Sequence, residues 1–476
     1  MSLLAGAFAL AVPLVLGLLL LALTCAHAPY RLAIGNFALA HLVGCGAITI
    51  LLLLNQLVFG KLSVLPVYGA LLILLSAWKH IGPRMSLLVA SQRGIEVPVG
   101  SRRNATVLKI LLLFIGICVL ATTLSGFKAG LGWDAWSFWQ LKARAFYIEG
   151  NMLYLKDTAH CFHPEYPPMI PLLSYWVFAH ARSTAELWPQ IIGLTFYLDL
   201  LAISYASLRL WIDTMPALAC TALVASSRVV QKYALAGYAD VAASVFMLAT
   251  AVFLARRFVD KDKTAGPPLL WMLAVTCLVK NETIAWTLAA LLIICGYGVI
   301  QRARAALISI GAFAAGLLPW FWLQHVWHLR DEMTTKAAGS LSASTAFASA
   351  LDIATHLAKY SIGIGPQYPA WGLSQILVIT GLILAARHRN QYVLPLLLLV
   401  MLQFISYVVV IVWAIWVDPG WTPIYMNDTL YRCLLQVYPT ALLLAGLGCF
   451  ASARPLNGPD AHATEAQKDL AAAPVN

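Results

Sequence analysis

Leu3-Leu-Ala-Gly-Ala-Phe-Ala-Leu-Ala-Val-Pro-Leu-Val-Leu-Gly-Leu-Leu-Leu-Leu-Ala-Leu23 is the stretch that decides the fold class. It is an uninterrupted apolar run of about twenty residues, the length an α-helix needs to cross a bilayer. Similar runs recur along a chain of 476 residues that is 61% hydrophobic and 11% charged. Inside lipid, only helices and closed β-barrels pair all of their backbone hydrogen-bonding groups. These runs lack the period-two alternation of barrel strands, which leaves helices. The sequence therefore predicts an all-α, polytopic integral membrane protein.

The charges of the chain predict its orientation in the bilayer. The net charge is +11, but the cations lie in short loops between apolar runs, so they indicate cytoplasmic loops and not a nucleic-acid partner. The first run lacks a basic segment before it, which favours a span over a cleavable signal. Nine cysteines follow no metal or disulfide spacing. The basic clusters expected on the cytoplasmic side are Lys79 to Arg103, Arg256 to Lys263, Arg302 with Arg304, and Arg387 with Arg389.

These clusters predict about thirteen transmembrane helices, with the N-terminus outside and the tail inside. The expected spans are residues 3–23, 34–59, 62–78, 107–124, 188–209, 214–230, 235–255, 268–281, 284–301, 304–323, 371–386, 391–416 and 433–451.

Four regions follow from this topology. Residues 1–106 form additional N-terminal helices and a basic cytoplasmic loop, and residues 107–323 form the main module. Residues 324–451 contribute the C-terminal helices and outer loops, and residues 452–476 form a disordered cytoplasmic tail.

Residues 169–181 are apolar but too short to span, and they begin among prolines. Counting them as a span would place Arg209 and the Arg256 cluster on the wrong sides of the bilayer. We therefore expect a juxtamembrane helix on the outer face, within one large outer loop over residues 125–187. Further outer loops are expected near 324–370 and 417–432.

The most informative polar stretch is Gly132-Trp-Asp-Ala-Trp-Ser-Phe-Trp-Gln-Leu-Lys-Ala-Arg144, which follows a long apolar helix. A lipid-linked phosphosugar donor requires cations beside the departing phosphate and a carboxylate that takes the acceptor proton, at membrane-surface depth. Asp134, Lys142 and Arg144 fit that requirement. On a helix, Asp134, Phe138 and Lys142 would share one face. The alternative is an interfacial aromatic belt with snorkelling cations.

A second polar cluster is His160-Cys-Phe-His-Pro-Glu-Tyr-Pro-Pro168. His163 and Glu165, with Tyr166 beside them, are candidates to position an acceptor. The pattern requires no cofactor, although His163 and Glu165 are compatible with a divalent metal ion. The alternative is a rigid loop fixed by its prolines.

Other polar residues lie near the outer ends of spans, where ionisable groups are costly and are either paired or functional. Each could bind substrate or form a structural ion pair, and Arg432 is suited to grip a phosphate. Asp199 differs, because it falls in mid-span, where a buried pairing role is expected. The candidates at the span ends are Tyr238, Asp240, Lys280, Glu282, Asp428 and Arg432.

Together these motifs resemble the C-type glycosyltransferase superfamily, in particular the group of protein O-mannosyltransferases and lipid A aminoarabinose transferases. The resemblance rests on an aspartate early in the first outer loop, followed by juxtamembrane helices and a return helix. It covers mainly residues 107–320. The motifs that carry it are Trp133-Asp134-Ala-Trp-Ser-Phe-Trp-Gln-Leu-Lys142, His163-Pro-Glu-Tyr-Pro-Pro168, Gly237-Tyr-Ala-Asp240 and Lys280-Asn-Glu282.

The resemblance implies transfer of a sugar from a polyprenyl-phosphate donor to a lipid, glycan or protein acceptor, on the outer, periplasmic face of a bacterial inner membrane. Asp134 would be the catalytic residue, His163 or Glu165 would line the acceptor or metal region, and Lys280 and Arg432 would contact the donor phosphate. The family often has a second carboxylate directly after the first, whereas this chain has Ala135. The alternatives are a transporter or flippase for lipid-linked glycans, a polysaccharide ligase or polymerase, and a structural membrane subunit.

Overall fold

The computed structural model describes residues 2–30, 32–90, 102–157, 159–301, 303–329, 343–361, 371, 374–387, 392–417 and 422–450. Within these ranges the secondary structure is helical throughout, which confirms the predicted all-α class. The long helices are α1 (Ser2–Thr24), α2 (Ala33–Phe59), α5 (Arg102–Ala129), α8 (Leu187–Leu208), α11 (Asp240–Phe258), α13 (Asn281–Gln301), α14 (Ala303–Trp327), α16 (Ala343–Ser361), α18 (Val393–Val417) and α20 (Leu430–Phe450).

Shorter helices connect and support them. They are α3 (Leu65–Ser76), α4 (Trp78–Ala90), α6 (Gln140–Glu149), α7 (Met169–Ala181), α9 (Thr214–Ser226), α10 (Arg228–Ala234), α12 (Gly266–Thr276), α17 (Ser374–Arg387) and α19 (Thr422–Ile424). Two short 3-10 helices, η3 (Leu153–Lys156) and η4 (Lys263–Ala265), and two π-helical turns, η2 (Ala135–Trp139) and η6 (Tyr425–Thr429), complete the described structure.

Eight of the described helices are long and apolar enough to cross a membrane, namely α1, α2, α5, α8, α11, α14, α18 and α20. A ninth crossing is possible if α3 and α4, which meet at a bend of 92°, count as one broken span. The protein is thus a polytopic membrane protein. Several of the thirteen expected spans are shorter than predicted, because hydropathy does not distinguish a spanning helix from a short helix buried among other helices.

Three of the expected spans illustrate the differences. The span at 62–78 ends at Ser76, where the chain turns into α4. The span at 214–230 is divided into α9 and α10, and the span at 268–281 is only the eleven-residue α12.

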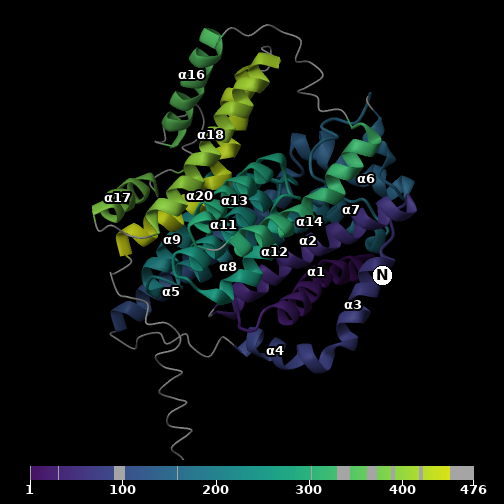
Figure 1. Ribbon diagram of the computed structural model, residues 1–476, viewed down its shortest axis with the longest axis horizontal. Coiled ribbons are helices and arrows are strands. Elements are labelled where there is room, and N and C mark those ends of the chain that lie inside the picture. Colours follow the sequence, from purple (N-terminus) through teal and green to yellow (C-terminus); the bar gives the residue numbers. More distant parts are fainter. Residues whose placement is uncertain are drawn as a thin grey trace, which may run out of the picture.

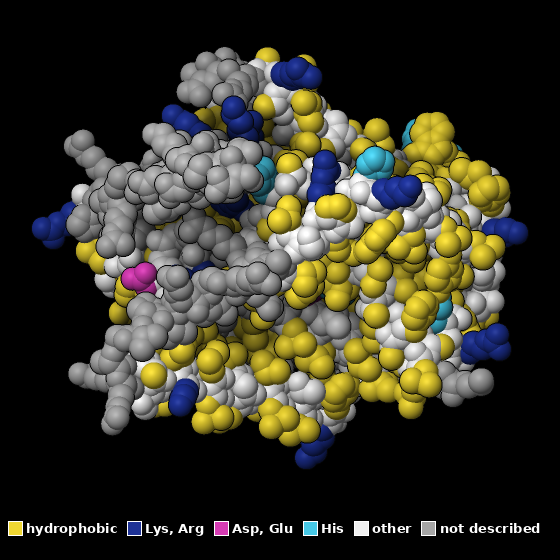
Figure 2. All heavy atoms as spheres, turned by 90° about the horizontal axis from the view of Figure 1, so that it is seen from below, with side chains coloured by type: hydrophobic (Ala, Val, Ile, Leu, Met, Phe, Trp, Pro, Cys, Tyr) yellow, Lys and Arg dark blue, Asp and Glu magenta, His cyan; other side chains and the backbone are white. Residues whose placement is uncertain are grey.

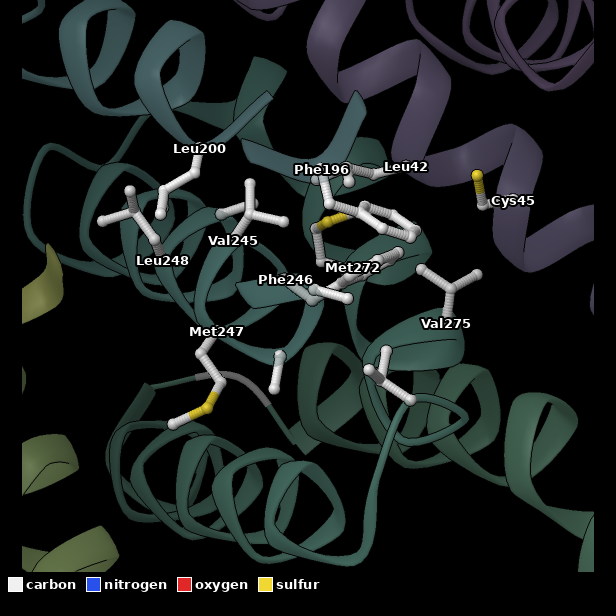
Figure 3. Close-up of a cluster of buried hydrophobic side chains, with 14 of the residues drawn as sticks. Leu42, Cys45, Phe196, Leu200, Val245, Phe246, Met247, Leu248, Met272 and Val275 are labelled. Carbon is white, nitrogen blue, oxygen red and sulfur yellow. The ribbon is translucent and has the colours of Figure 1, made fainter. Parts of the chain in front are cut away.

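The centre of the molecule is a group of helices buried on nearly all sides. Figure 1 shows α11, α12, α13 and α20 in the middle, with α1 to α4 on one side and α16 to α18 on the other. In α11, every residue from Asp240 to Arg256 is buried. Side chains of α2, α8, α11 and α12 meet there, among them Leu42, Phe196, Phe246 and Met272 (Figure 3). Figure 2 shows a largely hydrophobic face, as expected for a surface in contact with lipid.

The N-terminal helices belong to the same bundle as the segment between α6 and α8. The indole of Trp176 in α7 donates to the carbonyl of Ala9 in α1 at 2.9 Å. The backbone N–H of Met152 donates to Oε1 of Gln56 at 3.0 Å, and Leu62 N–H donates to the carbonyl of Gly150 at 2.7 Å. Residues 2–90 therefore anchor the segment that carries several of the predicted site residues.

Helix α7 is present as predicted, but it does not lie on the surface of the bundle. Eleven of its thirteen residues are buried, and it packs between α1, α2, α6 and α8. Burial among other helices does not place α7 relative to the bilayer, so its juxtamembrane position stays a prediction. The side of the membrane that α7 faces stays a prediction.

Candidate functional site

Arg432 is the centre of a network of charged side chains drawn from five segments. It lies in the first turn of α20, and its side chain is 8% exposed. Its Nη1 group donates to Oδ2 of Asp134 at 2.6 Å and lies 3.6 Å from Oδ2 of Asp428. Its Nε and Nη2 groups donate to Oδ2 of Asp240 at 3.0 and 2.8 Å. The structure thus brings together four residues that the sequence singled out separately.

Asp240 joins this arginine to the second cation of the network, Lys280. Its Oδ1 atom accepts from Lys280 Nζ at 3.0 Å and from Gln436 Nε2 at 2.9 Å. Asp240 is the first residue of α11, where the helix dipole favours a negative charge. Its side chain has no exposed surface, so Asp240 holds the two cations in place and offers nothing to a substrate in this structure.

Lys280 occupies a break in the chain between α12 and α13. Its Nζ group also lies 2.9 Å from Oε1 of Glu282, and Thr283 Oγ1 accepts from the Lys280 backbone N–H at 3.1 Å. Gln403 in α18 donates to the backbone carbonyl of Glu282 at 3.1 Å. Four carboxylates therefore surround two cations, and the network carries a net charge of −2 when all six groups are ionised.

Asp134 is held in place by hydrogen bonds between its own loop and the loop that precedes α11. Its backbone N–H donates to the Tyr238 hydroxyl at 3.2 Å, and Gly132 N–H donates to the carbonyl of Ala236 at 2.9 Å. A Cβ atom on Gly132 would lie 2.7 Å from the Tyr238 ring, and one on Gly237 would lie 2.9 Å from the Cβ of Ala135. Gly237 also has φ +76°, a conformation that glycine adopts without strain. Close approach of the loops therefore depends on these glycines.

Two π-helical turns adjoin the network. Asp134 precedes η2, and Asp428 lies within η6, four residues before Arg432. Such turns are rare and are frequently found at functional sites. The side chain of Asp134 is 20% exposed and that of Asp428 is 47% exposed. These two carboxylates are therefore the most exposed members of the network.

Tyrosines cover one side of Arg432. The Tyr238 ring centroid is 4.6 Å from the guanidinium carbon and that of Tyr233 is 5.7 Å from it. The Tyr233 hydroxyl donates to Oδ1 of Asp428 at 3.0 Å, and burial followed by the charge of Asp428 raises the pKa of Tyr233. Sequence reasoning missed Tyr233 and Gln436. Gln436 lies one helical turn after Arg432, a spacing that could have identified it.

His163 and Glu165 form a second, smaller group. His163 Nδ1 lies 3.2 Å from Oε1 of Glu165, and Gln324 in α14 donates to the Glu165 carbonyl at 2.8 Å. The His163 backbone is left-handed, with φ +50°. Among the described residues, no set of three His, Cys, Asp or Glu side chains is arranged to hold a metal ion. Within this part of the chain, His163 and Glu165 do not have the further ligand that a protein-bound metal usually requires.

Tyr166 lies between the two groups. Its ring stacks on Phe138 with centroids 5.9 Å apart. Burial, and after it the negative charges of Glu282 and Glu165, raise the pKa of Tyr166 well above its usual value. The second carboxylate oxygens of Glu165 and Glu282 are buried without a hydrogen-bond partner. Buried polar atoms are normally paired, so these two oxygens are candidates to accept hydrogen bonds from a ligand.

The two predicted cations of α6 do not join the network. Lys142 is 2% exposed, and its Nζ group donates to the backbone carbonyl of His163. The Arg144 guanidinium stacks 4.6 Å from the ring of Trp136, which is 45% exposed, and none of the ion pairs found in the described ranges involves Arg144. Lys142 thus supports the loop that carries His163, while Arg144 is partly buried and packs against Trp136.

Asp199 has the partner that its mid-span position predicted. Its Oδ2 atom lies 2.5 Å from Nδ1 of His41 in α2.

No protein-family model, no curated protein and no solved structure matches this chain.

Proposed function

We propose that this protein is a membrane-embedded glycosyltransferase that moves a sugar from a polyprenyl-phosphate donor to a lipid, glycan or protein acceptor. The observation that carries the proposal is the contact between Asp134 and Arg432, two residues 298 positions apart whose side chains meet at 2.6 Å. A partly exposed carboxylate beside a guanidinium supplies both a proton acceptor and a partner for a phosphate. The proposed setting is the outer face of a bacterial inner membrane.

The proposed reaction uses these groups as follows. The acceptor hydroxyl oxygen bonds to the anomeric carbon of the sugar, and its proton passes to Asp134. The bond between the anomeric carbon and the phosphate oxygen breaks, and its electron pair stays on the departing polyprenyl phosphate. Arg432 stabilises the charge that grows on that phosphate.

Donor binding must first free Arg432, because carboxylates occupy it in this structure. Asp428 is the weakest of its partners, at 3.6 Å and with nearly half of its side chain exposed. A donor phosphate would compete with Asp428 and Asp134 for the Nη1 group, while Asp240 keeps the guanidinium in place from the other side. A phosphate that takes the Nη1 group would also leave the Asp134 carboxylate free to accept the proton of the acceptor hydroxyl.

A transporter or flippase for a lipid-linked glycan is the second candidate. The break between α12 and α13, with Lys280 inside it, favours this function, because interrupted helices with ionisable residues often form transport sites. Product formation separates the two candidates, because a transporter moves its substrate without cleaving the sugar–phosphate bond.

The proposal is tested with purified protein in lipid nanodiscs, a panel of polyprenyl-phosphate sugars, and membrane extract as the source of acceptor. We expect release of free polyprenyl phosphate from one member of the panel and transfer of its sugar. Transfer from a soluble nucleotide sugar instead would contradict the proposed donor. Movement of the intact donor between leaflets without release of polyprenyl phosphate would support the transporter.

A further inference from the structure

A second group of reactive side chains lies away from the Asp134 network, between α2 and α8. Sγ of Cys45 is 3.5 Å from Nε2 of His41, and Nδ1 of the same ring is 2.5 Å from Oδ2 of Asp199. Cys45 is 2% exposed, and His41 and Asp199 are each 9% exposed. A thiol, an imidazole and a carboxylate are thus joined in one line, in the order of a nucleophile, a base and the group that orients the base.

One protonation state, with Asp199 ionised and the His41 ring neutral, orders the protons along this line. A carboxylate only accepts hydrogen bonds, so the ionised Asp199 requires the proton on Nδ1 of His41. The other ring nitrogen, Nε2, then carries a lone pair. In that state the Cys45 S–H donates to Nε2, and His41 is in position to take its proton.

A small cavity opens beside this line of residues. Its volume is about 10 Å³, and both His41 and Cys45 contribute to its lining together with apolar side chains such as Trp176 and Phe196. A cavity of this size holds about one water molecule. Figure 3 shows Cys45 on α2, beside the buried cluster that includes Phe196 and Val275. Only a ligand of nearly the size of water fits against the thiol without displacing this packing.

We propose that Cys45 is a nucleophilic thiol that reduces hydrogen peroxide or another peroxide of similar size. The Cys45 proton moves to Nε2 of His41, and Sγ bonds to one peroxide oxygen as the O–O bond breaks. The departing oxygen takes the proton from His41 and leaves as water. The sulfur becomes a sulfenic acid, so the thiol loses two electrons and the peroxide gains them.

Cys277 provides a matched comparison within the same protein. It follows the last residue of α12 and is 0% exposed, and its Sγ donates to the carbonyl of Ala274 in that helix at 3.3 Å. A thiol in that setting is expected to be inert, because buried cysteines without a base stay protonated. The difference between Cys45 and Cys277 therefore isolates the contribution of His41 and Asp199.

The test exposes intact protein in nanodiscs to limiting hydrogen peroxide and then unfolds it with dimedone, which marks sulfenic acid for mass spectrometry. We expect Cys45 to oxidise about tenfold faster than Cys277, or more, as for a thiol with a positioned base. Tert-butyl hydroperoxide, which exceeds the cavity, should oxidise the two cysteines at similar rates. Equal rates with hydrogen peroxide would overturn the proposal, and equal acceleration by the bulky peroxide would overturn the role of the cavity.

Variants separate activation from simple accessibility. Asp199→Asn keeps the shape of the carboxylate and should slow oxidation of Cys45 without changing that of Cys277. His41→Gln should slow it further. An unchanged Cys45 rate in folded Asp199→Asn protein would remove the carboxylate from the reaction. The comparison of two cysteines and two peroxides in the wild-type protein decides the main question even if neither variant folds.

Discussion

The guanidinium of Arg432 donates to Asp134 and Asp240 and lies close to Asp428, so three acidic segments meet at one side chain. These acids have different exposures, which separates their roles. Asp240 is completely buried and holds the cations, whereas Asp134 has exposed surface beside Arg432. In the proposed reaction, the catalytic role is therefore assigned to Asp134, and positioning of the cations is assigned to Asp240.

Replacing Asp134 with Asn should leave the fold intact and remove the base. An amide oxygen still accepts from Arg432, but it does not take a proton from the acceptor hydroxyl. We expect the transfer rate to fall by about 10² to 10⁴, the usual contribution of a general base. Asp157→Asn is the matched control, since Asp157 lies in the following loop and pairs with His160 outside the network. Near-normal turnover of folded Asp134→Asn protein would remove Asp134 from the mechanism and make Glu165 the next candidate.

Changes at Arg432 should distinguish stability from donor binding. Arg432→Ala leaves Asp240 buried without its main partner, and the loss of one member of a buried pair costs about 3–5 kcal/mol. We therefore expect a clear fall in the melting temperature. Arg432→Lys keeps the charge, so the variant should fold. It loses the two parallel N–H donors that bind two phosphate oxygens at once, so its KM for the donor should rise more than its kcat falls. A normal KM in Arg432→Lys would place the phosphate elsewhere.

The sequence identified the members of the network but not their arrangement. Charges are rare in this chain, so Asp134, Lys280 and Arg432 were conspicuous near the ends of apolar runs. Contacts between positions about 200 to 300 residues apart leave no local pattern. The sequence also predicted that Asp134, Phe138 and Lys142 share one face of an α-helix. The π-helical turn η2 changes the helical register between them, and Lys142 donates to a backbone carbonyl and not to the network.

Among the structural elements, the loop before α11 has the strictest requirements. Gly237 combines a left-handed backbone with a Cβ position only 2.9 Å from Ala135, so no larger residue fits without moving the loop that carries Asp134. Breaks in apolar helices were harder to predict than the helices themselves. The expected helix 235–255 begins only at Asp240, because Gly237 and its neighbours form the turn that reaches Asp134.

Gly237→Ala should therefore lower both stability and activity. The left-handed backbone alone costs a non-glycine residue about 1–2 kcal/mol, and the contact with Ala135 adds to that cost. Gly116→Ala in α5 is the control, because a Cβ there meets nothing within 4 Å. Melting temperature and transfer rate are the measurements. A Gly237→Ala protein as stable and active as Gly116→Ala would show that the two loops are free to separate without loss of function.

For the whole molecule, composition was sufficient to predict a helical membrane protein, but not the number of crossings. Short apolar helices such as α7, α9 and α12 have the composition of spans, yet they are buried among longer helices. The N-terminal helices also make hydrogen bonds to the main module. Through Trp176, Met152 and Gly150, they hold the segment that contains His163 and Glu165. We therefore expect residues 2–90 to be required for folding of that segment.

Helices α9 and α10 must together complete a crossing, because the spans α8 and α11 begin at the same end of the bundle. Gln190 in α8 donates to the carbonyl of Gly126, and Gly132 N–H donates to the carbonyl of Ala236 just before α11. Helix α9 has thirteen residues, so it is about 20 Å long, whereas the hydrocarbon core is about 30 Å thick. Residues 184 and 261, which precede α8 and follow α11, therefore lie on opposite faces of the membrane.

Reporter fusions at these two positions test the proposed outer site. Lys261 follows Arg256 and Arg257, which the charge rule places in the cytoplasm. Alkaline phosphatase, active only outside, should report at Thr184 and be silent at Lys261, while a fluorescent protein that folds only inside should give the opposite result. The inverted result, with a cytoplasmic signal at Thr184 and an outer signal at Lys261, would place the Asp134 network on the cytoplasmic face. Nucleotide sugars are available there as donors, so the argument for a polyprenyl-phosphate donor would lose its basis.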